Sequence, residues 1–186
     1  MRILSRKIFL RLVHEEDAEF IVDIRTDKKN ARFISSTSVS VDEQRKWIQR
    51  YKIREDTKDE YYFVGCLSDG TPFGTTRLYD FNNDVFTNGS WVVKKGTKPS
   101  YSALLDVLVR TYAFNNLQFS TCFFDVRKNN SKVIKFHQML GAKYAHSDEL
   151  NNYYNIQKID FFNSLNELVR LGIFDRNDLA YDVSED

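Results

Sequence analysis

Two polar side chains that could do chemistry stand in the segment 125–142, at a predicted junction between a strand and a helix. Asn130 lies at the expected start of the helix, and His137 lies about two turns further on. A neutral imidazole offers one donor and one acceptor and titrates near neutrality, so a half-buried His137 could move a proton. The alternatives are a core histidine satisfied by a backbone carbonyl and, for Asn130, an ordinary helix cap.

A strand and a short helix must position these side chains. The apolar, β-rich run 121–126 predicts the strand, and Gly141 is typical of the residue that closes a helix. Four residues between them share one side of a 3.6-residue repeat: Val133, Phe136, His137 and Leu140. We therefore expect His137 on or beside the buried face of this helix.

Composition limits the classes of protein to which the chain can belong. At 186 residues and 42% hydrophobic content, it is long enough for one well-packed domain. Lys and Arg total 27 against 26 acidic residues, which gives a formal charge of +1. No overall field favours nucleic acid or an anionic membrane, so any anion must be bound by local sites.

The N-terminal segment and the cysteines also exclude several classes. The apolar run near the N-terminus is too short for a signal peptide, and no stretch approaches the roughly 20 apolar residues of a membrane span, so we expect a cytoplasmic protein. Cys66 and Cys122 have no CxxC partner and are expected to be small buried residues. The three histidines, His14, His137 and His146, are too scattered to indicate a metal site, and none is predicted.

The remaining chain alternates predicted strands and helices. A strand at 8–13 precedes a helix within 14–27, and Ser40 with Glu43 forms a capping box before a second helix. Strands follow at 61–67, 73–79 and 89–93, and the helix at 101–115 has the strongest apolar periodicity in the chain. A closing hairpin is expected at 143–146 and 153–156. This order predicts an α/β fold.

The C-terminal segment predicts an additional amphipathic helix. Its apolar residues begin at Ile159 and recur at helical spacing: Phe161, Phe162, Leu165, Leu168 and Val169. We therefore expect a main domain at 1–158 and a helical extension at 159–186 that packs on the same domain. The acidic last six residues are expected to fray.

The order of elements and the stretch 91–142 resemble the GNAT superfamily of N-acetyltransferases, in particular its branch of ribosomal-protein and sugar acetyltransferases. The resemblance covers residues 8–158. It implies a central mixed, mostly antiparallel sheet flanked by helices. It also implies an acyltransferase that uses acetyl-CoA, whose pantetheine arm enters a gap between two splayed strands.

The resemblance assigns the cofactor to three segments. The family's Arg-Gly-x-Gly-x-Ala-like pyrophosphate loop falls on 97–102, where both glycines are replaced. Lys98 and Ser100 can still contact phosphate, but Pro99 removes a backbone N–H; the alternative is a plain loop that enters a helix. The expected cofactor-binding residues are Trp91, Val92, Val93, Thr97, Lys98, Ser100, Tyr101, Ser102, Asn130 and Phe136.

A second family motif, V-x-x-x-N-x-x-S-I-x-x-Y-x-K-x-G-F, matches the segment 126–142 more closely. The matching residues are Val126, Asn130, Val133, Ile134, His137, Met139 in the Lys position, Gly141 and Ala142. By resemblance, Asn130 would hydrogen-bond the pantetheine arm. His137 stands where the family places a tyrosine that protonates the departing thiolate, and an imidazolium could serve instead, because a thiolate of pKa about 8.5 needs only a modest acid.

The implied mechanism is direct attack of a neutral amine on the acetyl thioester. Backbone N–H groups around Val92 and Val93 would polarise the carbonyl. Asp80, Asp84 and Tyr154 are the candidates for the base, because they flank predicted strand ends. Each could equally be a turn or rim residue.

The family builds its acceptor pocket from the first two helices and their connection, which here contains Arg32, Phe33 and Ser35, with Ser36 and Thr37 next to them. Arg77 projects from the third strand. An arginine with an aromatic ring suits a small-molecule acceptor such as a nucleotide-linked amino sugar. The alternatives are a protein N-terminus, as in ribosomal-protein acetyltransferases, and a non-catalytic acyl-CoA-binding module. Exposed aromatic residues permit a homodimer without requiring one.

Overall fold

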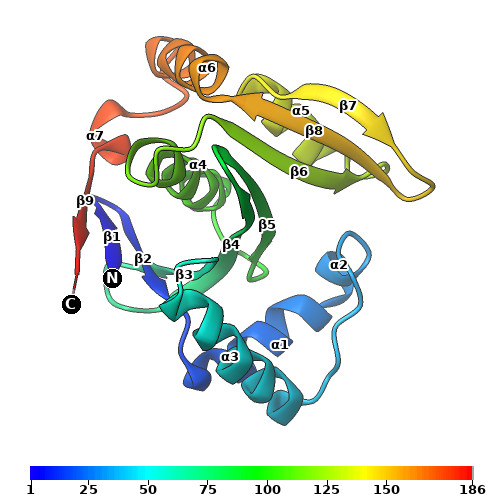
Figure 1. The fold of residues 1–186 in the computed structure, drawn as a ribbon. Helices are drawn as coiled ribbons and strands as arrows, with labels where there is room; N and C mark the ends of the chain where they lie inside the picture. The colour runs from blue at the N-terminus through cyan, green and yellow to red at the C-terminus, as the bar shows by residue number, and fades with distance from the viewer. Residues whose placement is uncertain (186) are drawn as a thin grey trace.

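The computed structural model describes residues 1–185 and contains one nine-stranded sheet (Figure 1). The strands run in the order β7-β8-β6-β5-β4-β3-β2-β1-β9. Their bounds are β1 Arg2–Ser5, β2 Ile8–Leu12, β3 Tyr61–Leu67, β4 Pro72–Asn82, β5 Val85–Val93, β6 Thr121–Arg127, β7 Lys143–Ser147, β8 Asn151–Gln157 and β9 Tyr181–Ser184. Among the described residues only β5 and β6 pair in parallel, so the expected mixed and mostly antiparallel sheet is confirmed.

Helices cover both faces of the sheet. They comprise the 3₁₀ turn η1 Glu15–Asp17 and the α-helices α1 Ala18–Thr26, α2 Lys28–Ala31, α3 Val41–Asp56, α4 Pro99–Asn115, α5 Ser131–Met139, α6 Lys158–Arg170 and α7 Arg176–Leu179. Figure 1 shows α1 and α3 beneath one face, whereas α4 fills the curve of the other. The strand β3 is buried on both sides because Tyr62 and Val64 face α1 and α3, whereas Phe63 packs with the α4 core.

The predicted helices at the positions of α1, α3, α4 and α5 are all present. Ser40 caps α3, since its side chain accepts a hydrogen bond from the Glu43 backbone N–H at 3.2 Å. Leu104, Leu105 and Leu108 are buried in the main core, as the periodicity of α4 predicted. The short strand β1 and the helix α2 were missed, because runs of four residues give too little periodicity to detect.

The sheet splits between β5 and β6. The two strands pair only from Val85 to Thr87 with Thr121 to Phe123, and beyond that point they separate. A bulge follows in β5, where the register with β4 shifts between Thr75 and Arg77 and Ser90 has a φ of 52°. A non-glycine residue in this region is uncommon and costs about 1–3 kcal/mol, so the surrounding structure must hold the bulge in place. Bulges of this kind redirect the backbone next to a site.

The C-terminal extension is integrated into the fold. Phe161, Leu165 and Leu168 on α6 belong to the main core. The chain then returns through α7, and β9 pairs antiparallel with β1 beside the N-terminus (Figure 1). The expectation that this terminus frays is wrong for residues 181–184, because β1 offers an open edge with which the last strand pairs; the expectation for Asp186 lies outside the described residues.

Candidate active site

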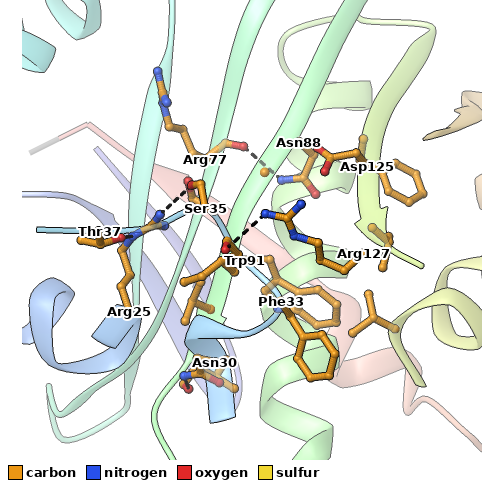
Figure 2. Close-up of a pocket in the computed structure, with 18 of the residues that line it drawn as sticks. Arg25, Asn30, Phe33, Ser35, Thr37, Arg77, Asn88, Trp91, Asp125 and Arg127 are labelled. Atoms are coloured by element: carbon orange, nitrogen blue, oxygen red, sulfur yellow. Dashed lines mark hydrogen bonds between the residues drawn. The ribbon is translucent and has the colours of Figure 1, made fainter. Parts of the chain in front are cut away.

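A deep cleft of about 1060 Å³ occupies the split between β5 and β6 and extends to α1, the α2–α3 loop and α3 (Figure 2). The volume exceeds that of most single-ligand pockets, so the cleft has room for two ligands side by side. Trp91, Val92 and Val93 line it from β5, as expected from the sequence. The expected acceptor residues Arg32, Phe33, Ser35 and Arg77 line the same cleft from its other end: the structure brings both groups together.

One wall of the cleft is built by hydrogen bonds from α1 and α2. The Arg25 guanidinium donates to the Thr37 hydroxyl at 2.7 Å and to the Ser35 hydroxyl at 3.3 Å, which holds the α2–α3 loop over the cleft. The Asn30 side-chain amide donates to the carbonyls of Ile24 at 2.8 Å and Val93 at 3.0 Å. Asn30 therefore ties the end of α1 to the end of β5.

The opposite wall comes from β6. Arg127 reaches across the cleft, and its guanidinium donates to the Ile34 carbonyl at 3.5 Å (Figure 2). Asp125 lines the cleft two residues earlier on the same strand. Partial burial raises the pKa of Asp125, and the nearby Arg127 charge opposes that rise. Sequence reasoning missed both residues as site candidates, because strand 121–126 was read only as an apolar run.

Arg77, at the acceptor end of the cleft, is held by an ion pair and by two aromatic rings. It forms an ion pair with the buried Glu60 carboxylate, and its guanidinium lies 4.5 Å from the Tyr79 ring centroid and 5.3 Å from that of Trp47. Arg32 lies over the Phe33 ring, 4.4 Å from its centroid. Stacked guanidinium groups keep their charge while they lose mobility, which favours planar anion recognition.

The floor of the cleft contains a fully buried ion pair. Asp106 and Arg110 lie one turn apart on α4, with 3.0 Å between the Asp106 Oδ2 and Arg110 Nε atoms. Arg110 also contacts the Cys122 sulfur at 3.1 Å and lies 4.5 Å from the Phe124 ring centroid. Burial raises the pKa of the Asp106 carboxyl, and the Arg110 charge opposes that rise.

His137 is buried among Trp91, Phe124 and Phe136, whose ring centroids lie 5.4, 4.4 and 5.2 Å from its own. Its Nδ1 atom has no hydrogen-bond partner, and the nearest Asp106 oxygen is 3.9 Å away, too far for a hydrogen bond. Burial, followed by the Arg110 charge, lowers the pKa of His137 well below its ordinary value. The imidazole is therefore neutral near pH 7, and the imidazolium acid expected from the sequence does not fit this environment.

The other expected cofactor residues fall into two groups. Asn130 lines the cleft, and although it occupies the N-cap of α5 its side chain makes no cap hydrogen bond, so its amide is available to a ligand. Ser102 also lines the cleft, and its carbonyl accepts from the Trp91 indole N–H at 3.1 Å. Phe136 lies behind Trp91 and faces a second cavity instead.

The loop before α4 lies outside the main cleft. Pro99 is the first residue of α4, and Thr97 donates its hydroxyl to the Lys94 carbonyl at 2.7 Å. Lys98 has its ammonium 5.6 Å from the Tyr101 ring centroid. Ser100 and Tyr101 line a second cavity of about 470 Å³ between α4, α5 and the C-terminal extension. The missing glycines therefore leave a helix N-terminus that carries side chains where the family motif has bare backbone.

The base candidates Asp80, Asp84 and Tyr154 do not line the cleft. Asp80 is exposed on β4, and Asp84 accepts a hydrogen bond from the Ser120 hydroxyl in a turn. Tyr154 is buried and stacks on Phe124, 5.6 Å between ring centroids. The two aspartates thus occupy the turn or rim positions that the sequence left open as their alternative, and Tyr154 is a core residue.

Positive charge dominates the lining of the cleft. Its three carboxylates are those of Glu43, Asp106 and Asp125. Its nine cationic residues are Arg25, Lys29, Arg32, Lys46, Arg50, Arg77, Arg110, Arg127 and Lys132. Most of these cations were missed, because the overall charge of +1 hides a cluster assembled from separate helices and strands.

A family model described as an acetyltransferase (GNAT) domain matches residues 7–143. The chain belongs to the GNAT acetyltransferases. It is therefore an acyltransferase, and acetyl-CoA is its donor. This GNAT chain fits the pantetheine arm, because β5 beyond Thr87 has no strand partner on its β6 side and the unpartnered Asn130 amide faces the same cleft.

Solved structures resemble the chain to different degrees. A structure described as "Apo FdhC, a nucleotide-linked sugar GNAT" is 35% identical, with a TM-score of 0.79 and coverage of 97% of this chain and 99% of that one. A spermidine N-acetyltransferase from Vibrio cholerae, in complex with CoA and spermine, is 15% identical at a TM-score of 0.73, covering 83% and 98%. A ribosomal-protein-S5-alanine acetyltransferase from Vibrio fischeri is 12% identical at 0.72, covering 87% and 98%.

No curated protein sequence matches the chain significantly. Within residues 1–185 no helix has the length and apolar character needed to cross a membrane, and no cluster of His, Cys, Asp and Glu side chains could hold a metal ion.

Proposed function

We propose that this GNAT enzyme acetylates the amino group of a nucleotide-linked amino sugar. The observation that carries the proposal is the cationic lining of the acceptor end of the cleft. Lys46 and Arg50 on α3, together with Arg32 and Lys29, form no ion pair within the described residues, so their charges remain available. A diphosphate linkage supplies the two or more negative charges that such a surface favours.

Aromatic rings next to these cations support the same acceptor. Phe33 and Trp47 line the cleft and both lie near guanidinium groups, Phe33 near Arg32 and Trp47 near Arg77. A nucleobase can stack on such a ring while its diphosphate contacts the adjacent arginine. The hydroxyls of Ser36 and Ser38, which also line the cleft, suit a sugar.

The same charge argues against other acceptors of GNAT enzymes. A polyamine carries several positive charges, and the nine cationic side chains of the cleft would repel it. Only three carboxylates line the cleft to attract it, and one of them is neutralised by Arg110. A basic protein N-terminus meets the same repulsion. The 35% identical structure over 97% of the chain, described as a nucleotide-linked sugar GNAT, also supports the proposal.

In this mechanism the cleft positions the amine against the thioester. A backbone N–H group of β5 near the Ser90 bulge, where the ladder with β4 is interrupted beside the cleft, polarises the thioester carbonyl. Asn130 orients the pantetheine arm, and the α2–α3 loop held by Arg25 fixes the acceptor. His137 contributes an apolar, uncharged floor rather than a proton.

The experiment compares acceptors and then removes cleft charge. Thiol release from acetyl-CoA is measured with a nucleotide-diphosphate amino sugar, the same amino sugar without its nucleotide, and spermidine. We expect the nucleotide-linked sugar to have the highest kcat/KM, and Lys46→Gln with Arg50→Gln to raise its KM about tenfold or more.

The matched control is Arg45→Gln, which removes a cation from the same helix outside the cleft, where Arg45 pairs with Asp42. It should leave the acceptor KM unchanged. A higher kcat/KM for spermidine than for the nucleotide-linked sugar would overturn the proposed acceptor.

A further inference from the structure

The point at which β5 and β6 separate holds one carboxylate, that of Asp125. The last paired residues are Thr87 on β5 and Phe123 on β6. Gly89 and Asp125 lie two residues beyond this pair on β5 and β6, and both line the cleft where the two strands have separated. In the proposed mechanism, the acceptor amine approaches the thioester carbonyl of acetyl-CoA at this place.

Strand alternation turns the Asp125 side chain towards the acceptor. Phe124 packs on His137 and under Arg110, which places it on the α4 and α5 side of the sheet. Asp125 therefore points to the opposite side, the side of Arg127, whose guanidinium contacts the acceptor loop at Ile34. Figure 2 shows Asp125 and Arg127 entering the cleft from β6, opposite Arg25 and Arg77.

No other carboxylate in the described lining of the cleft can take a proton from the acceptor. Asp106 is fully buried behind His137 and bonded to Arg110. Glu43 lies exposed in the first turn of α3, at the outer rim of the cleft. His137 lies in the floor of the cleft against Phe124, where burial and the Arg110 charge lower the pKa of its imidazole.

We propose that Asp125 is the general base that deprotonates the acceptor ammonium. This inference rests on the proposed transfer to an amine, and not on the identity of that amine. The carboxylate takes one proton from R–NH₃⁺, and the free amine forms the new C–N bond at the thioester carbonyl. As the C–S bond breaks, the second proton leaves the nitrogen and ends on the thiolate, so the products are amide and thiol. Asp125 then releases its proton to water.

The charged surroundings of Asp125 suit this role. Partial burial raises its pKa, and Asp148 acts in the same direction, whereas Arg127 opposes the rise. The phenols of Tyr79 and Tyr153 are the other titratable groups close enough to feel its charge. Asp125 accepts no side-chain hydrogen bond in the described structure that would hold it away from a ligand.

The test is Asp125→Asn, which keeps the shape of the side chain and removes the charge. At pH 7 we expect kcat to fall about 100-fold, with the KM for acetyl-CoA and the melting temperature unchanged. Without the base, the variant reacts only with acceptor molecules whose amine is already neutral, and their fraction rises about tenfold for each pH unit up to the pKa of the amine. The ratio of wild-type kcat to variant kcat should therefore fall about tenfold for each pH unit in that range. The control Glu149→Gln removes an exposed carboxylate from the β7–β8 turn and should retain wild-type rates.

Two results would overturn the inference: a variant within threefold of wild type at pH 7, or a deficit that stays constant across pH, as for a residue that only positions the acceptor. If the wild type acetylates a different amine from a panel, the proposed acceptor fails and the comparison is made with that amine. Absence of thiol release with every amine would overturn both proposals.

Discussion

His137 shows how surroundings decide the chemistry of a single residue. On sequence alone it is a titratable group in a family motif. In the structure it is 3% exposed, ringed by aromatic side chains and next to the Arg110 charge. Both influences disfavour the imidazolium, so the residue is ill suited to the role of a proton donor.

The depressed pKa of His137 predicts a pH-dependent stability. As the pH falls, the His137 imidazole binds its proton at a higher pH in the unfolded chain than in the folded protein, because burial disfavours the imidazolium. This contribution to stability is complete above the ordinary His pKa of about 6.5 and is lost as pH falls below it. We expect the free energy of unfolding to drop by about 1.4 kcal/mol between pH 7.5 and 5.5 from this group, measured by urea titration.

Substitution of His137 distinguishes its contribution to the pH dependence of stability from that of the other titratable groups. His137→Leu should remove that part of the pH dependence, whereas His146→Gln, at an exposed position on β7, should retain it. An unchanged pH dependence in His137→Leu would show that the pKa of His137 does not differ between the folded and unfolded chain, which would contradict the expectation.

At the scale of elements, α4 both fills the core and carries a charged pair into it. Eleven of its residues are buried, among them Asp106 and Arg110. Burying two charges is costly unless they pair and hydrogen-bond, and the Arg110 Nε–H, which donates to both Asp106 carboxylate oxygens, meets that condition. The pair forms part of the cleft floor, so the helix links core packing to the site.

Breaking this pair should be strongly destabilising. Arg110→Met leaves the Asp106 carboxylate buried without its partner, and we expect a loss of about 3–5 kcal/mol in chemical denaturation. The double variant Asp106→Leu with Arg110→Met should recover much of that loss, because no charge remains to be buried. Arg170→Met, in an exposed pair with Glu167, provides the control and should have no measurable effect. Equal stability of Arg110→Met and the wild type would contradict the expectation.

At the scale of the whole molecule, the C-terminal extension completes the core. Its helix α6 buries three large apolar side chains, and β9 covers the edge of β1. The family model ends at residue 143, but the 35% identical structure covers 97% of the chain. The extension is thus a shared feature with that structure and part of the same packed unit.

Truncation after Lys158 should therefore unfold the protein. Loss of Phe161, Leu165 and Leu168 removes about 6 kcal/mol of burial, which is comparable with the total stability of a domain. We expect an insoluble product or a chain without a cooperative thermal transition. Deletion of residues 181–186 alone, which removes only β9, should lower the melting temperature by a smaller amount. A truncated chain that melts like the full chain would show that the extension is dispensable.

The sequence by itself determined the elements and the family. The apolar repeat of α4, the capping box of α3 and the Asn130 motif depend on short-range spacing, which side-chain periodicity and backbone capping fix locally. The order of elements indicated the α/β fold, and the resemblance to the GNAT family implied acetyl-CoA. Four-residue elements such as β1 and α2 were not predicted from the sequence, since their formation depends on neighbours far away in the chain.

Only the tertiary structure decided the chemistry of the site. The cationic cleft draws Arg25, Arg50 and Arg127 from three separate elements, so a net charge of +1 gave no sign of it. The role proposed for Asp125 depends on its place in the cleft where β5 and β6 separate, and burial disfavours the imidazolium expected at His137. Both outcomes depend on desolvation and on distances between charges, which are properties of packed side chains and are absent from the linear order of residues.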